Sequence, residues 1–322
     1  MGRLGGMGRH HLNGRRSVCA VGVVTHPGHE RSRNEDAFAY PIPHGGAAER
    51  GYAYRLPIGE VSRLWVVADG VGGSEEGQRA SEQAVRVMVD RYYTGPSACD
   101  ETVRLEEAVI AANRAVIALA EEAGTTGSTT LTGLLVSSDR AVIAHVGDSR
   151  LYHIRDGRIV QVTQDHDLLG ELVRSGLMTP EEASLSEASS VITRSIGSKS
   201  DATPDIAEIA LQSKDAFVLC TDGLTRHVLD EEIARIVAVA RTPQQAAQML
   251  VDLALERGGK DNVTVMVIRS GQAFRPNLTF AIIRLLALII LLAGLAWSAY
   301  VALQQGRLPD PTVSPVATSA HP

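Results

Sequence analysis

Four aspartates stand at the ends of apolar runs. Asp69 follows LWVVA, Asp148 follows AVIAHVG, Asp222 follows AFVLCT, and Asp261 precedes NVTVMVI. Any one of them is most simply a turn residue, because Asp-Gly and Asp-Asn pairs favour turns. However, Asp69 and Asp222 lead into Gly-rich or helix-like sequence instead of a second strand. Strand-end carboxylates beside small residues are the oxygen ligands that Mg²⁺ and Mn²⁺ prefer, and an adjacent glycine lets a backbone carbonyl approach the ion.

The elements that must position these side chains are strands and paired helices. Apolar runs predict strands at 17–24, 61–68, 131–136, 141–146, 150–154, 159–162, 216–220 and 263–268, with a hairpin turn at Asp156–Gly157. Helical spacing predicts helices at 74–92, 102–122 and 231–240, the last with Asp230 as its N-cap, and a fourth opened by Thr242–Pro243 and closed by Gly258. Because the helices come in pairs between runs of strands, antiparallel sheets with outer helix pairs are favoured over βαβ alternation. We expect the polar stretch 163–201 to be a mobile excursion.

Composition excludes several classes of protein. The 322 residues are 44% hydrophobic, which is too apolar for a disordered chain. The formal net charge of −6, without blocks of Lys or Arg, argues against nucleic acid as a partner. Cys19, Cys99 and Cys220 form neither a disulfide framework nor a CxxC metal site and fit a reducing compartment. We expect Cys220 to be a core residue.

The two ends of the chain differ from its middle. Residues 1–16 carry four Arg and no acid or apolar stretch, which predicts a flexible basic tail and no signal peptide. Residues 285–303 carry no charge, and in a helix they would span about 29 Å, the thickness of a bilayer core. The alternative is a buried core helix, but such helices are seldom apolar over this length.

We therefore expect a linker at 271–278, a transmembrane helix at 279–303 and a disordered tail at 304–322. Lys and Arg are more frequent before the span than after it. The positive-inside rule then predicts a single-pass protein of the cell membrane whose residues 1–277 are cytoplasmic and whose C-terminus lies outside.

Eight short motifs occur in an order that resembles one family. They are RSRNEDAF (31–38), VVADGVGG (66–73), GSTT (127–130), GDSRLY (147–152), TQDHDLLGELVRSG (163–176), TRSIG (193–197), CTDGL (220–224) and GGKDNVTV (258–265). Together they resemble the metal-dependent protein phosphatase 2C family in its bacterial form, over residues 17–270. The resemblance implies an α+β fold, a four-layer αββα sandwich of two antiparallel sheets flanked by helix pairs, here followed by the C-terminal transmembrane helix.

The resemblance also implies two divalent ions, Mn²⁺ or Mg²⁺, in the active site. Asp69 resembles the carboxylate that bridges the two ions, and the Gly70 carbonyl resembles a further ligand. Asp222 and Asp261 resemble the remaining ligands of the first ion. Glu35 and Asp36 match the acidic pair that holds the second ion.

Two further residues have roles implied by the family. Arg31 matches the arginine that binds the substrate phosphate, a role suited to its bidentate fork. Asp148 resembles the ligand of a third, weaker metal in bacterial members, although it could instead fix its turn or pair with Arg150.

The implied mechanism is attack on phosphorus by a hydroxide that bridges the two ions, while the ions and Arg31 offset the charge of the phosphoryl oxygens.

Two positions depart from the family. Position 71 is Val, where many eukaryotic members have a His that can protonate the leaving group. The flap segment LSEASSVITRSIG lacks the usual His-Pro pair, which leaves flap conformation and substrate choice open. For His166 a structural role is favoured over catalysis, and a binding role for segment 41–63 stays open.

The leading hypothesis is a membrane-anchored phosphatase that acts on Ser/Thr-phosphorylated proteins and opposes bacterial Ser/Thr kinases, which are themselves among its expected partners. The alternative is a non-catalytic scaffold with the same fold that binds phosphoproteins. Loss of metal carboxylates would favour the scaffold, and none is lost. A P-loop interpretation of TTGSTT fails because no Lys precedes the Ser or Thr.

Overall fold

The computed structural model describes residues 18–42, 51–55, 62–72, 75–96, 99–137, 139–179, 182, 191–198 and 202–271. The chain divides into two units, Met1–Ala273 and Phe274–Pro322, and every described residue belongs to the first. The basic tail, the linker, the transmembrane helix expected at 279–303 and the final tail lie outside the described residues. Within the described ranges, no helix has both the length and the apolar character needed to cross a bilayer.

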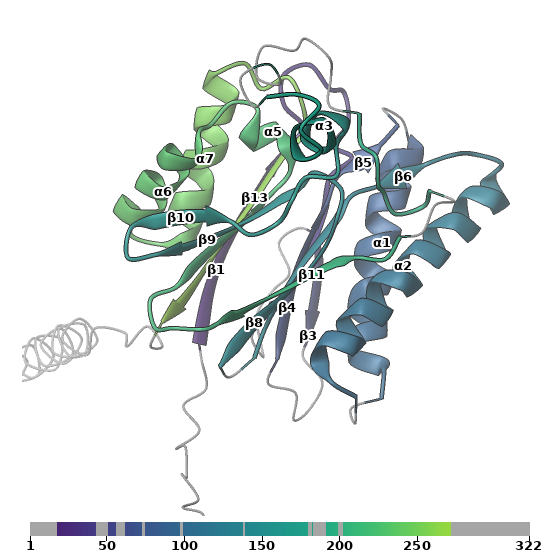
Figure 1. Cartoon of the computed structure of the whole chain (residues 1–322), viewed down its shortest axis with the longest axis horizontal. Coiled ribbons are helices and arrows are strands. Elements are labelled where there is room, and N and C mark those ends of the chain that lie inside the picture. Colours follow the sequence, from purple (N-terminus) through teal and green to yellow (C-terminus); the bar gives the residue numbers. More distant parts are fainter. Residues whose placement is uncertain are drawn as a thin grey trace, which may run out of the picture. The chain divides into compact units, whose positions relative to one another are not determined.

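Two sheets form the centre of the first unit (Figure 1). The order in the five-stranded sheet is β1 (Val18–His26), β13 (Val263–Gly271), β12 (Ala216–Cys220), β9 (Arg150–Arg155) and β10 (Arg158–Gln161). The order in the six-stranded sheet is β11 (Asp205–Ala210), β8 (Arg140–Val146), β7 (Leu131–Val136), β4 (Arg63–Ala68), β2 (Ala37–Ile42) and β3 (Tyr52–Arg55). A short pair, β5 (Gly70–Val71) and β6 (Ser128–Thr129), forms a separate ribbon.

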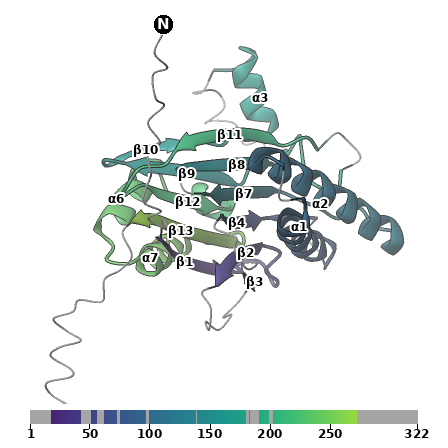
Figure 2. The same ribbon diagram turned by 90° about the horizontal axis from the view of Figure 1, so that it is seen from below.

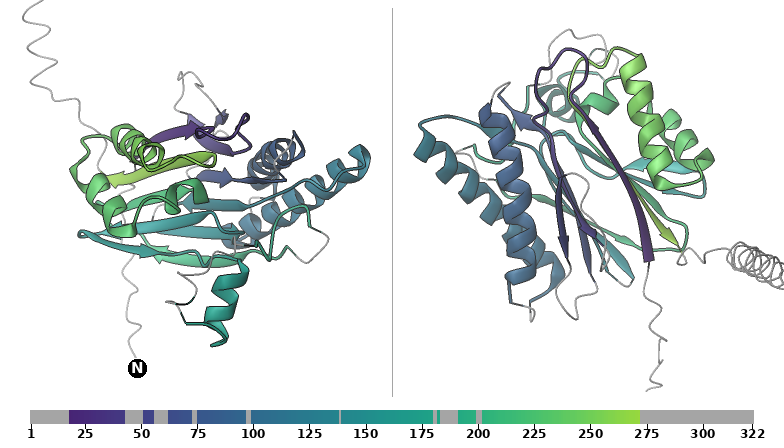
Figure 3. Two further views of the ribbon diagram at one scale, coloured as in Figure 1. Left: turned by 90° about the horizontal axis from the view of Figure 1, so that it is seen from above. Right: turned by 180° about the vertical axis from the view of Figure 1, so that it is seen from behind.

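Helix pairs cover the outer faces of the two sheets, as Figure 2 shows. Helices α1 (Glu75–Thr94) and α2 (Glu101–Ala123) pack on the six-stranded sheet, and α6 (Asp230–Val239) and α7 (Pro243–Glu256) pack on the five-stranded sheet. The view from behind shows β1 beside β13, with α7 against them (Figure 3). The described residues therefore confirm the α+β, four-layer αββα sandwich.

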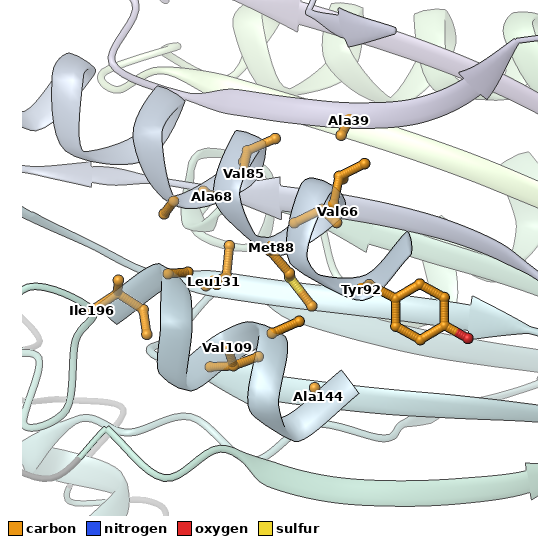
Figure 4. Packing of buried hydrophobic residues seen from close by; sticks show 14 of the residues in the cluster. Ala39, Val66, Ala68, Val85, Met88, Tyr92, Val109, Leu131, Ala144 and Ile196 are labelled. Atoms are coloured by element: carbon orange, nitrogen blue, oxygen red, sulfur yellow. The ribbon is translucent and has the colours of Figure 1, made fainter. Parts of the chain in front are cut away.

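Three apolar clusters hold these layers together. One lies between α1, α2 and the six-stranded sheet, and its side chains interdigitate around Met88 and Leu131 (Figure 4). A second lies beneath α6 and α7, and a third, which includes Trp65 and Phe217, fills the space between the sheets. Strands β7 and β12 are buried along their whole length because both of their faces are covered, which explains their unbroken apolar sequences.

Several boundaries match the prediction closely. Strands β7 and β12 have the expected bounds, and the β9–β10 hairpin turns at Asp156 and Gly157, both with positive φ. Helix α7 begins as expected, because the Thr242 side chain accepts a hydrogen bond from the Gln245 amide and a proline follows this cap. The N-cap of α6 is Leu229, so the assignment of Asp230 was wrong by one residue.

Other features depart from the prediction. The β2–β3 pair is parallel, so the six-stranded sheet is not purely antiparallel. Strands β2, β3 and β11 and helix α3 (Leu168–Arg174), which lies within the stretch expected to be a mobile excursion, were missed. Exposed, half-buried or proline-containing positions interrupt the apolar pattern of the missed strands.

Candidate active site

The sandwich brings the predicted aspartates to one edge of the two sheets. Strands β4 and β8 both pair antiparallel with β7, so their C-terminal ends, which precede Asp69 and Asp148, lie at the same edge. Strand β12 ends before Asp222 where its antiparallel neighbour β13 begins after Asp261. A cavity of about 410 Å³ opens there, and its walls include Arg31, Glu35, Asp69, Gly70, Asp148, Asp222, Arg226 and Asp261. Seven of these eight residues were predicted from the sequence, and Arg226 was not.

The backbone of Asp69 is fixed by the GSTT motif. The Asp69 amide donates to Oγ1 of Thr130 (2.8 Å), and the Asp69 carbonyl accepts from the Thr130 amide (2.9 Å) and from Oγ1 of Thr129 (2.8 Å). Oγ1 of Thr130 also lies 2.7 Å from Oγ of Ser149, the residue after Asp148. The two threonines therefore fix the position of Asp69 relative to the turn that contains Asp148.

Asp36 is half-buried beside this cavity and does not line it. Its Oδ2 accepts hydrogen bonds from Oγ1 of Thr221 (2.9 Å) and of Thr264 (2.6 Å). Burial, together with the charges of the nearby Asp222 and Asp261, raises the pKa of the Asp36 carboxyl to about 7, although the hydrogen bonds from the two hydroxyls act to lower it. The site thus contains a carboxyl group that is costly to ionise without a cation.

Glu35 is positioned mainly through its main chain. Its amide donates to Oδ1 of Asn262 (2.8 Å), and its carbonyl accepts from Oγ of Ser81 (2.5 Å). A Cβ atom on Gly77 of α1 would lie 2.2 Å from Oε2 of Glu35, and one on Gly70 would lie 2.4 Å from the Gly77 carbonyl oxygen. Glycine at both positions therefore allows helix α1, β5 and the acidic pair to approach closely.

Each carboxylate of the cavity destabilises the ionised form of its neighbours. Burial, followed by the charges of neighbouring aspartates, raises the pKa of Asp69 well above its usual range, and burial raises that of Asp148 to about 7. The Oδ1 atoms of Asp36, Asp148 and Asp222 are buried and make no hydrogen bond. Buried oxygens of this kind normally have a partner, and a divalent cation would satisfy them. The residues present therefore fit the metal ions that the sequence predicted.

Arginine side chains lie against these carboxylates in the structure. Nη2 of Arg31 is 2.9 Å from Oδ2 of Asp261, and Arg226 forms an ion pair with Asp222 and places Nη1 3.8 Å from the same Asp261 oxygen. In this arrangement, no group of three or more His, Cys, Asp or Glu side chains among the described residues could hold a metal ion. The two guanidinium groups occupy the Oδ2 atoms of Asp222 and Asp261, which an ion bound there could otherwise use.

The open question about Asp148 is partly resolved by its neighbour. Arg150 forms a forked ion pair with Asp165, with Nε and Nη2 at 2.9 and 2.7 Å from Oδ2. Arg150 is therefore committed to another partner, and Asp148, which lines the cavity, keeps a buried oxygen without a hydrogen bond. Its assignment to a third metal stays a prediction.

His166 has the structural role that the sequence favoured. Its Nδ1 accepts from the Gly147 amide (3.0 Å), and its Nε2 lies 3.0 Å from Asp205 and 2.7 Å from Arg194. It thereby ties the turn before Asp148 to the 193–197 motif. Cys220 is fully buried in the core, as expected, and burial raises the pKa of its thiol to about 12.

Residues missed from the sequence are Ser81, Thr221, Arg226, Asn262 and Thr264. Three of them lie within the CTDGL and GGKDNVTV motifs, Thr221 and Asn262 directly beside predicted ligands and Thr264 three residues after Asp261, which was the available signal. Arg226 follows Asp222 by four residues, the spacing at which helical side chains form ion pairs.

Comparison with known proteins agrees with this architecture. Residues 55–255, more than half of the chain, match the family model for protein phosphatase 2C. The Ser/Thr phosphatase stp of Listeria innocua is 33% identical over 208 residues, which cover 63% of this chain and 82% of the relative. The Ser/Thr protein phosphatase PstP of Mycobacterium tuberculosis is 36% identical over 64% of this chain, but the match spans only 40% of that longer protein.

Solved structures show the same fold. The catalytic domain of the phosphatase PstP, solved in complex with two manganese ions, superposes with a TM-score of 0.64 at 30% identity. That superposition covers 79% of this chain and 98% of the solved one. By sequence and by fold, the chain belongs to the protein phosphatase 2C family and is a Ser/Thr protein phosphatase of the bacterial type.

Proposed function

We propose that this chain is a membrane-anchored, metal-dependent phosphatase that hydrolyses phosphoserine and phosphothreonine in proteins and reverses Ser/Thr kinase signalling. The observation that carries the proposal is the cavity in which acidic side chains from separate strand ends meet Arg31. The two manganese ions bound by the related PstP domain support a requirement for Mn²⁺ or Mg²⁺, two per site. A third, weaker ion at Asp148 is part of the proposal.

The ligands of these ions would come from the residues described above. Asp69, Asp222 and Asp261 would hold the first ion, and Asp69 with Glu35 and Asp36, directly or through water, would hold the second. The Gly70 carbonyl would be a further ligand. Such ions supply a lowered pKa for water and positive charge for the phosphoryl oxygens.

The chain's own side chains account for the remaining requirements of the reaction. Arg31 is half-exposed at the cavity, so its planar fork can reach a substrate phosphate. Thr129 and Thr130 fix the position of Asp69, and Thr221 and Thr264 orient Asp36. Val71 lines the cavity and has no proton to donate, so this position does not protonate the leaving oxygen.

Membrane anchoring is the second part of the proposal. It is supported by the uncharged stretch 285–303 and by the excess of Lys and Arg before it. This topology would place the catalytic domain in the cytoplasm, where phosphorylated proteins, including Ser/Thr kinases, are its substrates.

The test uses the full-length chain in membranes and in non-ionic detergent. We expect hydrolysis of a phosphothreonine peptide with added Mn²⁺, loss of activity in EDTA, and a loss of about 100-fold or more in Asp222→Asn. Asp252→Asn, on the exposed face of α7, is the matched control and should retain full activity. Unchanged activity in EDTA or in Asp222→Asn would refute the metal mechanism, and release of the chain from membranes by alkaline carbonate would refute the anchor.

A further inference from the structure

Arg226 occupies an unusual place at the edge of the cavity. It follows the short helix α5 (Asp222–Thr225), and its side chain is 48% exposed while its guanidinium reaches into the cavity. There it pairs with Asp222 and approaches Asp261, the two carboxylates expected to bind the first metal ion.

Arg226 and Arg31 share one carboxylate oxygen. Nη2 of Arg31 lies 2.9 Å from Oδ2 of Asp261, and Nη1 of Arg226 lies 3.8 Å from that same atom. The distance between the two nitrogens is therefore at most the sum of these two contact distances. Two guanidinium groups that approach one carboxylate oxygen are close enough together to donate, at about 2.8 Å each, to oxygens of a single phosphate. The two arginines are thus near enough to each other to bind a single phosphate.

The charges around Arg226 indicate when this side chain can bind another anion. A divalent ion bound by Asp222 and Asp261 would take over the neutralisation of their charge, and the guanidinium would lose these partners. Burial acts to lower the pKa of Arg226, but the neighbouring carboxylates have the larger effect and raise it. The guanidinium is therefore cationic both before and after a metal ion binds. A freed, half-exposed guanidinium at the cavity edge needs another anion, and its planar fork matches phosphate.

We propose that Arg226 is a second phosphate-binding arginine, which Asp222 and Asp261 hold until metal ions bind and which then grips the substrate phosphate together with Arg31. This inference rests on the proposed phosphatase function. It assigns a substrate contact to a residue outside the predicted site.

The test measures binding directly and does not depend on turnover. Using the full-length chain in detergent, isothermal titration calorimetry determines the affinity for Mn²⁺ and, in the Mn²⁺-loaded protein, for inorganic phosphate. In Arg226→Gln we expect phosphate to bind about tenfold more weakly and Mn²⁺ to bind several-fold more tightly, because the ion no longer displaces a guanidinium. The KM for a phosphothreonine peptide should rise by a similar factor to the phosphate dissociation constant.

Two further variants separate the proposed role from a structural one. Arg226→Lys keeps the charge without the fork and should restore phosphate affinity only in part. Arg235→Gln removes an exposed cation of α6 outside the cavity and should change neither affinity. Weaker Mn²⁺ binding in Arg226→Gln would show that Arg226 merely supports the aspartates, and would overturn the inference. Unchanged phosphate affinity in this variant, or no phosphate binding by the Mn²⁺-loaded wild type, would also overturn it. A wild type that binds phosphate but hydrolyses no phosphopeptide would instead count against the proposed function.

Discussion

Replacing Asp36 with Asn should stabilise the metal-free protein at alkaline pH. Asp36 is half-buried with its Oδ1 fully enclosed, and this loss of solvation together with Asp222 and Asp261 raises its pKa to about 7 from a usual value of 3.8. The folded state therefore binds the Asp36 proton more tightly than the unfolded state does. The stability that this proton provides is complete below about pH 3.8, falls steadily between about 3.8 and 7, and is fully lost above about 7.

The size of the effect follows from the shift in pKa. An increase of about three in the pKa of Asp36 corresponds to a loss of about 4 kcal/mol in the free energy of unfolding once Asp36 is ionised in the folded state. Asparagine carries no charge, and its Oδ1 can still accept from Thr221 and Thr264. Its amide nitrogen would replace the buried Oδ1 of Asp36, which makes no hydrogen bond, and a buried unsatisfied donor costs about 1–3 kcal/mol. We therefore expect Asp36→Asn to be more stable than the wild type by about 2 kcal/mol at pH 8, and nearly equal to it at pH 5.

The assay is urea unfolding of the full-length chain in non-ionic detergent with EDTA, followed by circular dichroism at pH 5 and pH 8. Asp252→Asn, an exposed substitution, controls for a general loss of negative charge. Added Mn²⁺ should reverse the order at pH 8, because the variant lacks one ligand charge. If Asp36→Asn were no more stable than the wild type at pH 8 without metal, the reasoning about the buried carboxylate would be wrong.

Three other substitutions separate the site from the scaffold. Gly77→Ala should weaken Mn²⁺ binding at least tenfold, measured by calorimetry, because the new Cβ would displace the Glu35 carboxylate; wild-type affinity would contradict this. Thr264→Val removes a hydroxyl that donates to Asp36 and should weaken Mn²⁺ binding by about 10- to 100-fold, and a smaller effect would show that the hydroxyl is dispensable. Met88→Ala, in the core beneath α1, should lower the free energy of unfolding by about 2–5 kcal/mol in urea titrations but leave Mn²⁺ affinity unchanged; a changed affinity would mean that the core and the site are coupled.

The parts of the fold that were predictable are those with an unambiguous apolar pattern. Strands β7 and β12 are covered on both faces, so their sequences are apolar throughout and their bounds could be read directly. Strand β11 has exposed and half-buried residues only, and β2 contains Pro41, so neither stood out from a loop. The parallel pairing of β2 with β3 depends on tertiary packing that no local pattern encodes.

The candidate site divides in the same way. Asp69, Asp148 and Asp222 were recognisable because each follows a buried strand and precedes a break in the pattern. The hydroxyls of Thr221 and Thr264 could not be assigned, because they meet Asp36 only through the pairing of β12 with β13 and the packing of a segment far away in sequence. Arg226 was missed for another reason, since an arginine after a short helix is ordinarily a solvated surface residue.

The central claim is that the acidic cavity binds the divalent ions required for hydrolysis. The most direct test is equilibrium dialysis of the full-length chain against Mn²⁺, with bound metal counted by mass spectrometry and phosphothreonine-peptide hydrolysis measured on the same samples. We predict about two ions per wild-type chain, activity that rises with occupancy, and loss of both bound metal and activity in Asp69→Asn. Full metal content in Asp69→Asn, or full hydrolysis by metal-free wild type, would contradict the claim.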